Sequence, residues 1–322
     1  MNDTPLLAPM IERADVEAAR ERIAPYIRLT PVMEAKNLRR PPADVRLFLK
    51  LEHLQASGSF KARGATNKLL CTPKQELANG IVTASGGNHG LATARAAQIA
   101  GVAATVFVPE TISTEKIAKL EQWGAAVKLA GCVWDDANAA ALQFAADMGV
   151  AYFHPFGDPL VVAGQGTVGI EIAEQLPDID TLLVAIGGGG LVAGLCVALK
   201  AARPDLRIIG IEPSGSPTLK ASLDAGQVVR LPTVTTRVAT MGCGKTVEPV
   251  FSLVRRHLDD LVLVEDEALV EAARWLWFEL GIAADLSGAA GIAALREGKV
   301  EVPSGAKVCV LICGAGSEGL SF

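Results

Sequence analysis

Short apolar runs alternate with helical stretches along most of this chain, and this alternation constrains the fold more than any other feature. Strands that alternate with helices of this length form parallel sheets with right-handed crossover connections. Strands are expected at Arg46–Leu51, Gly80–Ala84, Ala104–Val108, Ala126–Leu129, Val150–Phe153, Leu182–Ile186, Arg207–Ile211, Leu261–Val264 and Lys307–Ile312. Helices are expected at Asp15–Tyr26 with Asp15 as N-cap, at Lys61–Leu70, Asn88–Ala100, Ser113–Trp123 and Asp135–Met148, and in two stretches that end at Gln175 and Ala202. The sequence therefore predicts an α/β fold with open, twisted, mostly parallel sheets flanked by helices.

The length of 322 residues suits two domains better than one compact core. We find no internal repeat and no low-complexity linker that would mark a boundary. A change in the glycine-rich turns places the boundaries near residues 53 and 155. We therefore expect a large domain made of residues 1–52 and 156–322, and a small domain made of residues 53–155.

Composition and charge exclude several classes of protein. The net charge of −5 leaves no basic stripe for nucleic acid. The N-terminus lacks the apolar core of a signal peptide, and the long apolar run 181–199 is interrupted by glycines, so neither a leader nor a membrane span is expected. The six cysteines are scattered without a C-x-x-C pair, which favours a reducing cytoplasm over disulfides or structural zinc.

Three glycine-rich loops follow expected strands, at the sheet edge where parallel α/β folds bind ligands. In the first, Ser85–Gly90, the backbone amides, the Ser85 hydroxyl and the start of a helix suit a small carboxylate, although a plain turn capped by Asn88 fits equally well. In the second, Gly187–Gly190, four residues without a Cβ allow the amides to close on a phosphate. In the third, Cys313–Ser317, a buried small thiol is the commoner interpretation.

The second loop also allows a remote alternative. Gly187 and Gly189 follow a strand, and Glu212 ends the next one, which is the layout of a dinucleotide-binding unit in an oxidoreductase. The last position of that motif is Val192, where the motif requires a glycine or alanine. The phosphate interpretation is therefore preferred.

Lys61 lies between Gly58 and Gly64, beside Phe60, where a helix is expected to start. A helix N-terminus and burial both lower the pKa of a lysine, and only the neutral amine attacks a carbonyl to form a Schiff base. A single lysine is more often an ordinary solvated residue that opens a helix. The rest of the chain has to decide between these two interpretations.

The runs Ser59–Ala65, Ser85–Gly90 and Gly187–Gly190 resemble the threonine/serine dehydratase family, whose members are pyridoxal 5′-phosphate (PLP) enzymes of the tryptophan-synthase-β fold type (fold type II). The resemblance covers nearly the whole chain in the expected order, and 153–156 (Phe-His-Pro-Phe) also fits it. It implies that PLP lies in the cleft between the two domains, bound by the large one, while the small domain carries the carboxylate loop. It implies an ammonia-lyase that eliminates water from L-threonine or L-serine, or a related β-hydroxy amino acid, to give a 2-oxo acid and ammonia.

The resemblance also implies roles for individual residues. Lys61 would hold PLP covalently and move the Cα proton of the substrate, Phe60 would lie against the pyridine ring, and Asn88 would bind its 3′-oxygen. The phosphate would be held by Gly187, Gly188, Gly189, Gly190 and Leu191. Gly242 belongs to a small-residue loop over the ring, and Cys313 would face the pyridine nitrogen, where a thiol makes the ring a weaker electron sink than a carboxylate does. The substrate carboxylate would be bound by Ser85, Gly86, Gly87, Asn88 and His89.

Departures from the family pattern guide the choice of reaction. Serine racemases carry a second serine where this chain has Gly86, so we expect elimination without efficient racemisation. Thr218 replaces the aspartate that joins Glu212 and Ser216 in a cation site of several relatives, so we expect no metal. Asp285 stands where the family has a glutamate, and this allows an atypical substrate.

Other properties stay open or follow only from the resemblance. A β-replacement enzyme or a racemase remains the alternative activity. The chain ends shortly after Ile312, so no regulatory amino-acid-binding domain and no inhibition by isoleucine are expected. We expect a cytoplasmic homodimer with neither nucleic-acid nor membrane partners. The preferred amino acid and its stereochemistry are not specified by these residues.

Overall fold

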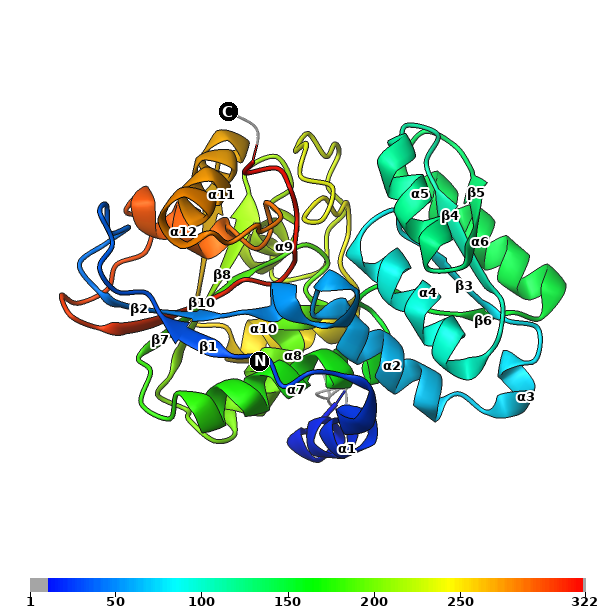
Figure 1. Cartoon of the computed structure of the whole chain (residues 1–322), viewed down its shortest axis with the longest axis horizontal. Helices are drawn as coiled ribbons and strands as arrows, with labels where there is room; N and C mark the ends of the chain where they lie inside the picture. The colour runs from blue at the N-terminus through cyan, green and yellow to red at the C-terminus, as the bar shows by residue number, and fades with distance from the viewer. Residues whose placement is uncertain (1–10, 321–322) are drawn as a thin grey trace.

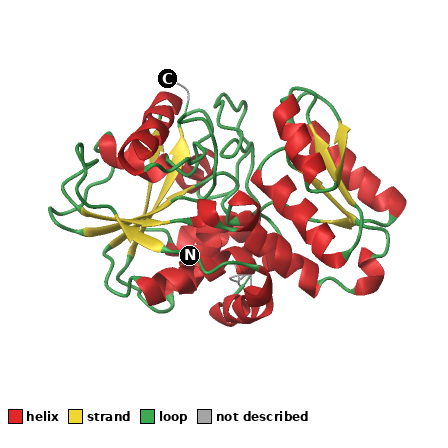
Figure 2. Cartoon of the chain, viewed as in Figure 1, coloured by secondary structure: helices red, strands yellow, loops and turns green. Residues whose placement is uncertain are grey.

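Two separate sheets form the framework of the computed structural model, which describes residues 11–320 (Figures 1 and 2). The larger sheet has the strand order β1(Val32–Glu34)-β2(Arg46–Lys50)-β10(Lys307–Leu311)-β7(Thr181–Ala185)-β8(Arg207–Pro213)-β9(Asp260–Val264). The smaller has the order β5(Ala125–Leu129)-β4(Ala104–Val108)-β3(Ile81–Ala84)-β6(Ala151–Tyr152). Only the β1–β2 pair is antiparallel among these strands. The predicted α/β fold with mostly parallel sheets is confirmed.

Helices cover both faces of each sheet. The α-helices are α1 Arg13–Ile23, α2 Lys61–Cys71, α3 Lys74–Leu77, α4 Asn88–Ala100, α5 Thr114–Gln122, α6 Trp134–Met148, α7 Pro159–Gln175, α8 Gly190–Lys200, α9 Thr218–Ala225, α10 Glu248–His257, α11 Asp266–Leu280 and α12 Ala290–Arg296. In Figure 1, α11 and α12 lie above the larger sheet, and α7 and α8 lie below it. Around the smaller sheet, α4 and α5 share one apolar core, while α6 packs into another on the opposite face.

The start of the chain differs from the prediction. Asp15 is not the N-cap of the first helix, because α1 begins at Arg13. The Asp15 carboxylate accepts a hydrogen bond of 2.8 Å from the backbone amide of Glu12, the residue that precedes the helix. The helix also ends at Ile23, and the next three residues form a 3₁₀ turn that contains Pro25. Proline has no amide hydrogen to continue an α-helix, so the change of helix type at this point follows from the sequence.

Helix α2, which begins at Lys61, is held against α7 by a glycine contact. A Cβ on Gly164 would lie 2.7 Å from the Cα of Gly64. The next crossing, of α7 with α8, is equally close, since a Cβ on Gly194 would lie 2.5 Å from the carbonyl oxygen of Val162. Contacts this short exclude any side chain, so these glycines set the position of α2 relative to the larger sheet.

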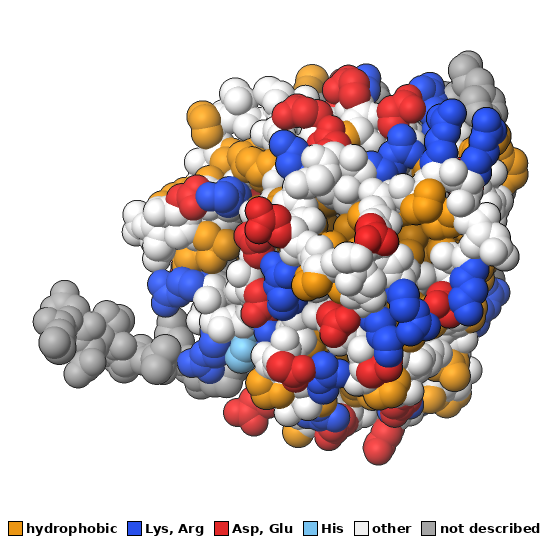
Figure 3. All heavy atoms as spheres, turned by 90° about the vertical axis from the view of Figure 1, so that its left-hand side faces the viewer, with side chains coloured by type: hydrophobic (Ala, Val, Ile, Leu, Met, Phe, Trp, Pro, Cys, Tyr) orange, Lys and Arg blue, Asp and Glu red, His pale blue; other side chains and the backbone are white. Residues whose placement is uncertain are grey.

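The surface carries both signs of charge. On the face shown in Figure 3, acidic and basic side chains are interspersed, without a broad patch of one sign. Across residues 11–320, no helix combines the length and apolarity that a membrane crossing requires. All six cysteines fall within this range and are free thiols.

Candidate active site

Lys61 is the first residue of α2, and the residue is half-buried. Its Nζ donates a hydrogen bond of 2.7 Å to the carbonyl oxygen of Pro155 and lies 5.2 Å from the centre of the Phe60 ring. Burial lowers the pKa of Lys61 to about 8, and the nearby thiols of Cys313 and Cys243 only partly oppose this shift. With this pKa about a fifth of the amine is neutral at pH 7.4, against about a thousandth for an ordinary lysine, and only the neutral form acts as a nucleophile or base.

The segment after β10 runs beside the loop that carries Lys61. The backbone amide of Phe60 donates to the carbonyl oxygen of Cys313 at 3.1 Å, and the amide of Ala315 donates to that of Gly58 at 2.8 Å. Ser59 and Gly314 form an isolated antiparallel bridge between these two contacts. The third glycine-rich loop therefore lies directly beside the lysine.

The carboxylate loop, Ser85–Gly90, is connected to the third glycine-rich loop through Asp285. Asn88, the first residue of α4, donates its Nδ2 hydrogen to Asp285 Oδ2 at 2.7 Å. Asp285 Oδ1 accepts from Ser287 Oγ at 2.7 Å and from the Gly288 amide at 2.6 Å, and Ser287 Oγ accepts from Cys313 Sγ at 3.4 Å. This chain of contacts joins Asn88 to Cys313. The sequence drew attention to Asp285 but gave no sign of Ser287.

Packing alone already requires glycines in the run between β7 and α8. A Cβ on Gly188 would lie 2.3 Å from the ring of Phe156, and one on Gly190 would lie 2.6 Å from the carbonyl oxygen of Phe156. Gly189 has φ +90°, which side chains rarely adopt. The run ends at the N-terminus of α8, with Leu191 in the first turn, where backbone amides have no partner within the helix. These amides can bind an anion.

The loop that contains Gly242, which is expected to lie over the cofactor ring, lies beside this glycine run. A Cβ on Gly187 would lie 3.2 Å from the carbonyl oxygen of Thr240 and 3.3 Å from the Cα of Met241. Gly242 follows directly in the sequence. The two segments to which a PLP ring and its phosphate were assigned are therefore adjacent.

In the carboxylate loop, Ser85 Oγ accepts a hydrogen bond of 3.3 Å from the Gly87 amide, just before α4 starts. A Cβ on Gly86 would lie only 2.6 Å from Cδ1 of Ile112, so this side chain occupies the space that a larger residue at position 86 would need. The His89 side chain has another partner, because its Nε2 lies 3.0 Å from the carbonyl oxygen of Phe153. Burial lowers the pKa of His89 to about 3, so the ring is neutral. A contribution of His89 to carboxylate binding would therefore come from its backbone amide.

Several buried polar atoms around the lysine have no protein partner. Among the described residues these include the hydroxyls of Ser57 and Ser59 and the Nδ1 atom of His89. Ser57 also has φ 58°, an uncommon backbone conformation for a residue other than glycine. Unpartnered buried polar atoms and unusual backbone conformations are both typical of ligand sites.

The residues of the family's cation site are satisfied by protein groups. The Glu212 carboxylate accepts hydrogen bonds from the amides of Leu219 at 2.8 Å and Lys220 at 2.9 Å, in the first turn of α9. Burial raises the pKa of Glu212 to about 7. The hydroxyls of Ser216 and Thr218 both donate to the carbonyl oxygen of Cys243. Residues 11–320 contain no cluster of three or more His, Cys, Asp or Glu side chains that could hold a metal.

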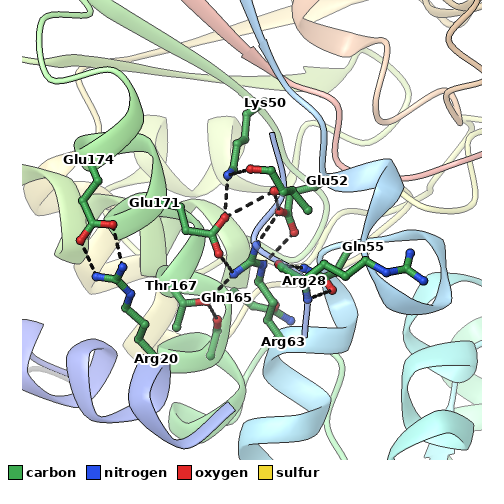
Figure 4. Close-up of polar contacts among 12 residues, drawn as sticks. Arg20, Arg28, Lys50, Glu52, Gln55, Arg63, Gln165, Thr167, Glu171 and Glu174 are labelled. Atoms are coloured by element: carbon green, nitrogen blue, oxygen red, sulfur yellow. Dashed lines mark hydrogen bonds and ion pairs between the residues drawn. The ribbon is translucent and has the colours of Figure 1, made fainter. Parts of the chain in front are cut away.

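Arg63 has a structural role that the sequence did not reveal (Figure 4). It binds both oxygens of Glu52, at 2.7 and 2.8 Å, and also Glu171 at 2.6 Å. Lys50 binds the other oxygen of Glu171 at 2.6 Å. All four side chains are buried, and two positive charges balance two negative ones. We call these residues the buried charge network. It fixes α2 to β2 and α7, two residues after Lys61.

A family model for pyridoxal-phosphate-dependent enzymes matches residues 23–314 of this chain. The chain belongs to this family. It is 38% identical to the L-threonine ammonia-lyase of Geobacter sulfurreducens over 296 residues, which are 92% of the chain and 73% of that protein. It is 40% identical to the L-threonine ammonia-lyase of Thermotoga maritima over 268 residues, which are 83% of the chain but only 66% of that protein. The structure of maize serine racemase superposes with a TM-score of 0.90 at 31% identity, covering 95% of the chain and 94% of the racemase.

The residues present in the site fit PLP, which is the cofactor of this enzyme family. Lys61 supplies a buried amine of lowered pKa for the aldehyde. The amides at the start of α8 supply an anion site for the phosphate. The unpartnered Ser59 hydroxyl supplies a further polar group one residue from Phe60. The resemblance to fold type II PLP enzymes that the sequence predicted is confirmed.

Proposed function

We propose that this enzyme is an ammonia-lyase that eliminates water from a β-hydroxy α-amino acid of the L-threonine or L-serine type. The observation that carries the proposal is Lys61, a half-buried residue whose Nζ donates a hydrogen bond to the carbonyl oxygen of Pro155 beside the Phe60 ring and whose pKa is lowered by desolvation to about 8. It lies between a candidate phosphate loop and a candidate carboxylate loop. Two L-threonine ammonia-lyases among the relatives support the same reaction.

The roles of the side chains follow from their positions. PLP, when bound, supplies the electron sink that makes the substrate Cα–H bond acidic. Lys61 Nζ takes up the Cα proton, while the amides at the start of α4 bind the substrate carboxylate. Burial raises the pKa of the Cys313 thiol, which keeps it neutral, so it would place no negative charge beside the pyridine nitrogen of bound PLP. Cys313 would in this way leave the cofactor a weaker electron sink than a carboxylate at the same position would.

The first experiment measures the release of 2-oxo acid and ammonia from serine, threonine, 3-hydroxyaspartate and phenylserine, each in both enantiomers. We expect turnover of the L-threonine or L-serine type. Lys61→Ala should lose both turnover and the visible absorbance of lysine-bound PLP. Formation of a new amino acid with an added nucleophile, in place of a 2-oxo acid, would establish a β-replacement enzyme and contradict the proposal.

The racemase alternative is disfavoured at Gly86. A second acid or base on the opposite face of the substrate is needed to return the proton with inversion, and glycine has no side chain to supply one. Ile112 fills the space beside Gly86 with an apolar group that transfers no proton either. Elimination without efficient racemisation is therefore the outcome that these residues favour. Deuterium incorporation with inversion of L-serine, at a rate that rivals ammonia release, would contradict it.

The domain boundaries, the oligomeric state and the cellular location are proposed together with the function. We propose a large PLP-binding domain of residues 1–52 and 156–322 and a small domain of residues 53–155. All strands of the smaller sheet fall between residues 81 and 152, which supports this division. A cytoplasmic homodimer that requires no metal is proposed as well, with the free cysteines in support of a reducing compartment. Sedimentation of the holoenzyme tests the dimer.

A further inference from the structure

Asp285 lies between two residues, Asn88 and Cys313, that the family resemblance assigns to PLP. It belongs to the segment between α11 and α12, and only 4% of its surface is exposed. One carboxylate oxygen is bound to Asn88, and the other reaches Cys313 through Ser287. Asn88 and Cys313 follow strands of different sheets: Asn88 begins α4, which follows β3 of the smaller sheet, and Cys313 follows β10 of the larger sheet.

Three donors are hydrogen-bonded to the Asp285 carboxylate. They are the Asn88 amide nitrogen at 2.7 Å, the Ser287 hydroxyl at 2.7 Å and the Gly288 backbone amide at 2.6 Å. A carboxylate accepts only, whereas a protonated acid would direct its own hydrogen at one of these donors. Burial and the nearby carboxylate of Glu318 raise the pKa of Asp285, and the three donors oppose that shift. The geometry matches the ionised form.

The ionised carboxylate determines the orientation of Asn88. An asparagine amide can usually rotate by half a turn and exchange its oxygen for its nitrogen. Here that rotation would turn the amide oxygen toward a carboxylate, which has no hydrogen to give. The Asn88 nitrogen therefore stays on Asp285, and its second hydrogen and the amide oxygen have fixed directions.

The same carboxylate sets the direction of hydrogen bonds on its other side. Ser287 gives its only hydroxyl hydrogen to Asp285, so its oxygen is left to accept. The Cys313 thiol donates to that oxygen at 3.4 Å. The thiol hydrogen thus points to Ser287, and only the sulfur lone pairs remain for another neighbour of Cys313.

Gly314 provides a second sign that this contact is built into the fold. A Cβ at position 314 would lie 2.3 Å from Asp285 Oδ2 and 2.7 Å from Asn88 Nδ2, the two atoms of the bond. Any residue other than glycine would push these atoms apart. The backbone after β10 is therefore adapted to the contact between Asp285 and Asn88.

We infer that Asp285 is a positioning residue, whose carboxylate orients the Asn88 amide and the Cys313 thiol toward PLP. The inference rests on the proposed function and on the family resemblance, which assigns Asn88 to the 3′-oxygen and Cys313 to the pyridine nitrogen. It predicts that Asp285 affects the binding and electronic state of the cofactor through its two neighbours, and that it does so without touching the substrate.

The test is a double-mutant cycle on the affinity for PLP, with the apoprotein as the starting point. Asp285→Asn keeps the shape of the side chain but replaces one of its two acceptor oxygens with an NH₂ group, which then faces either the NH₂ group of Asn88 or the backbone amide of Gly288. We expect this variant to raise the Kd for PLP about tenfold, equivalent to about 1.4 kcal/mol. Asn88→Ala alone should raise the Kd similarly, and in that background Asp285→Asn should have little further effect on it. Equal effects of Asp285→Asn in both backgrounds would overturn the inference.

Two further readouts separate positioning from a general structural role. The thermal unfolding midpoint of the apoprotein should change little in Asp285→Asn, and the cofactor's absorbance maximum should shift in the same direction in Asp285→Asn and Ser287→Ala. A large fall of the apoprotein midpoint with no shift of absorbance would indicate a structural role only. Asp180→Asn is a control for the same substitution at an exposed aspartate. Asp180 also accepts a hydrogen bond from a backbone amide, that of Lys307 at 2.8 Å, but it precedes β7, at the opposite end of the strand from the glycine run. Asp180→Asn should leave the Kd unchanged.

The outcome is separable from that of the proposed function. If wild-type protein binds PLP and releases 2-oxo acid but the cycle is additive, the role of Asp285 is wrong and the function stands. If wild-type protein binds PLP without lyase activity, the function is wrong, and a coupled cycle still establishes the role of Asp285 toward PLP. Wild-type apoprotein that does not take up PLP contradicts both.

Discussion

Removing Arg63 from the buried charge network should cost far more stability than removing a comparable charge from the surface. In Arg63→Met, Glu52 loses the guanidinium that binds both of its oxygens, and keeps a hydrogen bond from the Thr30 hydroxyl. Glu171 is less affected, because Lys50 still binds it. A buried charge left without its partner typically costs about 3–5 kcal/mol. The whole stability of a protein is about 5–15 kcal/mol, so this variant should be close to unfolding.

Figure 4 contains the matched control for this experiment. Arg20 and Glu174 form a pair of similar geometry, with two contacts of 2.5 and 2.6 Å. Their side chains are 40% and 52% exposed, so water replaces each lost contact. Pairs of this kind contribute about 1 kcal/mol or less, and Arg20→Met should cost no more than that.

Urea unfolding of the apoproteins, followed by circular dichroism, measures both costs. We expect a much lower midpoint for Arg63→Met than for Arg20→Met, with similar slopes. The double variant Arg63→Met/Glu52→Gln should recover part of the loss, because it removes the unpaired charge as well as its partner. This recovery remains informative if Arg63→Met alone is insoluble. Equal midpoints for the two single variants, or a double variant less stable than Arg63→Met, would refute the reasoning.

Three further predictions concern the chemistry of the site. Burial lowers the pKa of Lys61 to about 8, so the rate at which the apoprotein captures PLP should rise about tenfold per pH unit below pH 8 and level off above it. Absorbance follows the capture. A rate that still rises at pH 10 would contradict the lowered pKa. Gly86→Ser should displace Ile112, slow ammonia release severalfold and introduce deuterium exchange with inversion of L-serine. An unchanged ratio of inverted serine to 2-oxo acid would argue against the role of this position. EDTA and Mg²⁺ should leave the turnover of the wild-type enzyme unchanged. In Thr218→Asp, the new carboxylate beside Glu212 should make the stability of the protein depend on Mg²⁺. Loss of wild-type turnover in EDTA that Mg²⁺ restores would establish a required cation.

Local patterns explain which parts of the fold were predictable. All nine expected strands are present, with ends that differ by at most two residues, because each is an apolar run between turn residues. The additional strand β1, Val32–Glu34, is only three residues long and half-buried, so it has no recognisable period. Helices α9 to α12 were also absent from the prediction. Parallel pairing followed from the alternation of elements, whereas the antiparallel edge strand had no such sign.

The candidate site was predictable only as far as it is made of contiguous motifs. The lysine, the carboxylate loop and the glycine run are short segments whose residue types limit their chemistry. The contact between Asn88 and Asp285 joins residues 197 positions apart, and no local pattern predicts it. The buried charge network was missed for a different reason. Charged residues are rarely buried without partners, and partners distant in sequence are invisible before the chain folds.

The motif that begins at Lys61 shows why the sequence specified the fold type more closely than the substrate. Lys61 supplies the reactive amine, Arg63 enters the buried charge network, and Gly64 allows α2 to touch α7. The Gly64 amide also donates to Gln165 at 3.2 Å, and a Cβ there would lie 2.7 Å from the carbonyl oxygen of Val161. Each residue type is thus required for a separate physical reason, which makes the motif specific. All of these reasons concern the placement of one amine, so none of them constrains the side chain of the amino acid on which that amine acts.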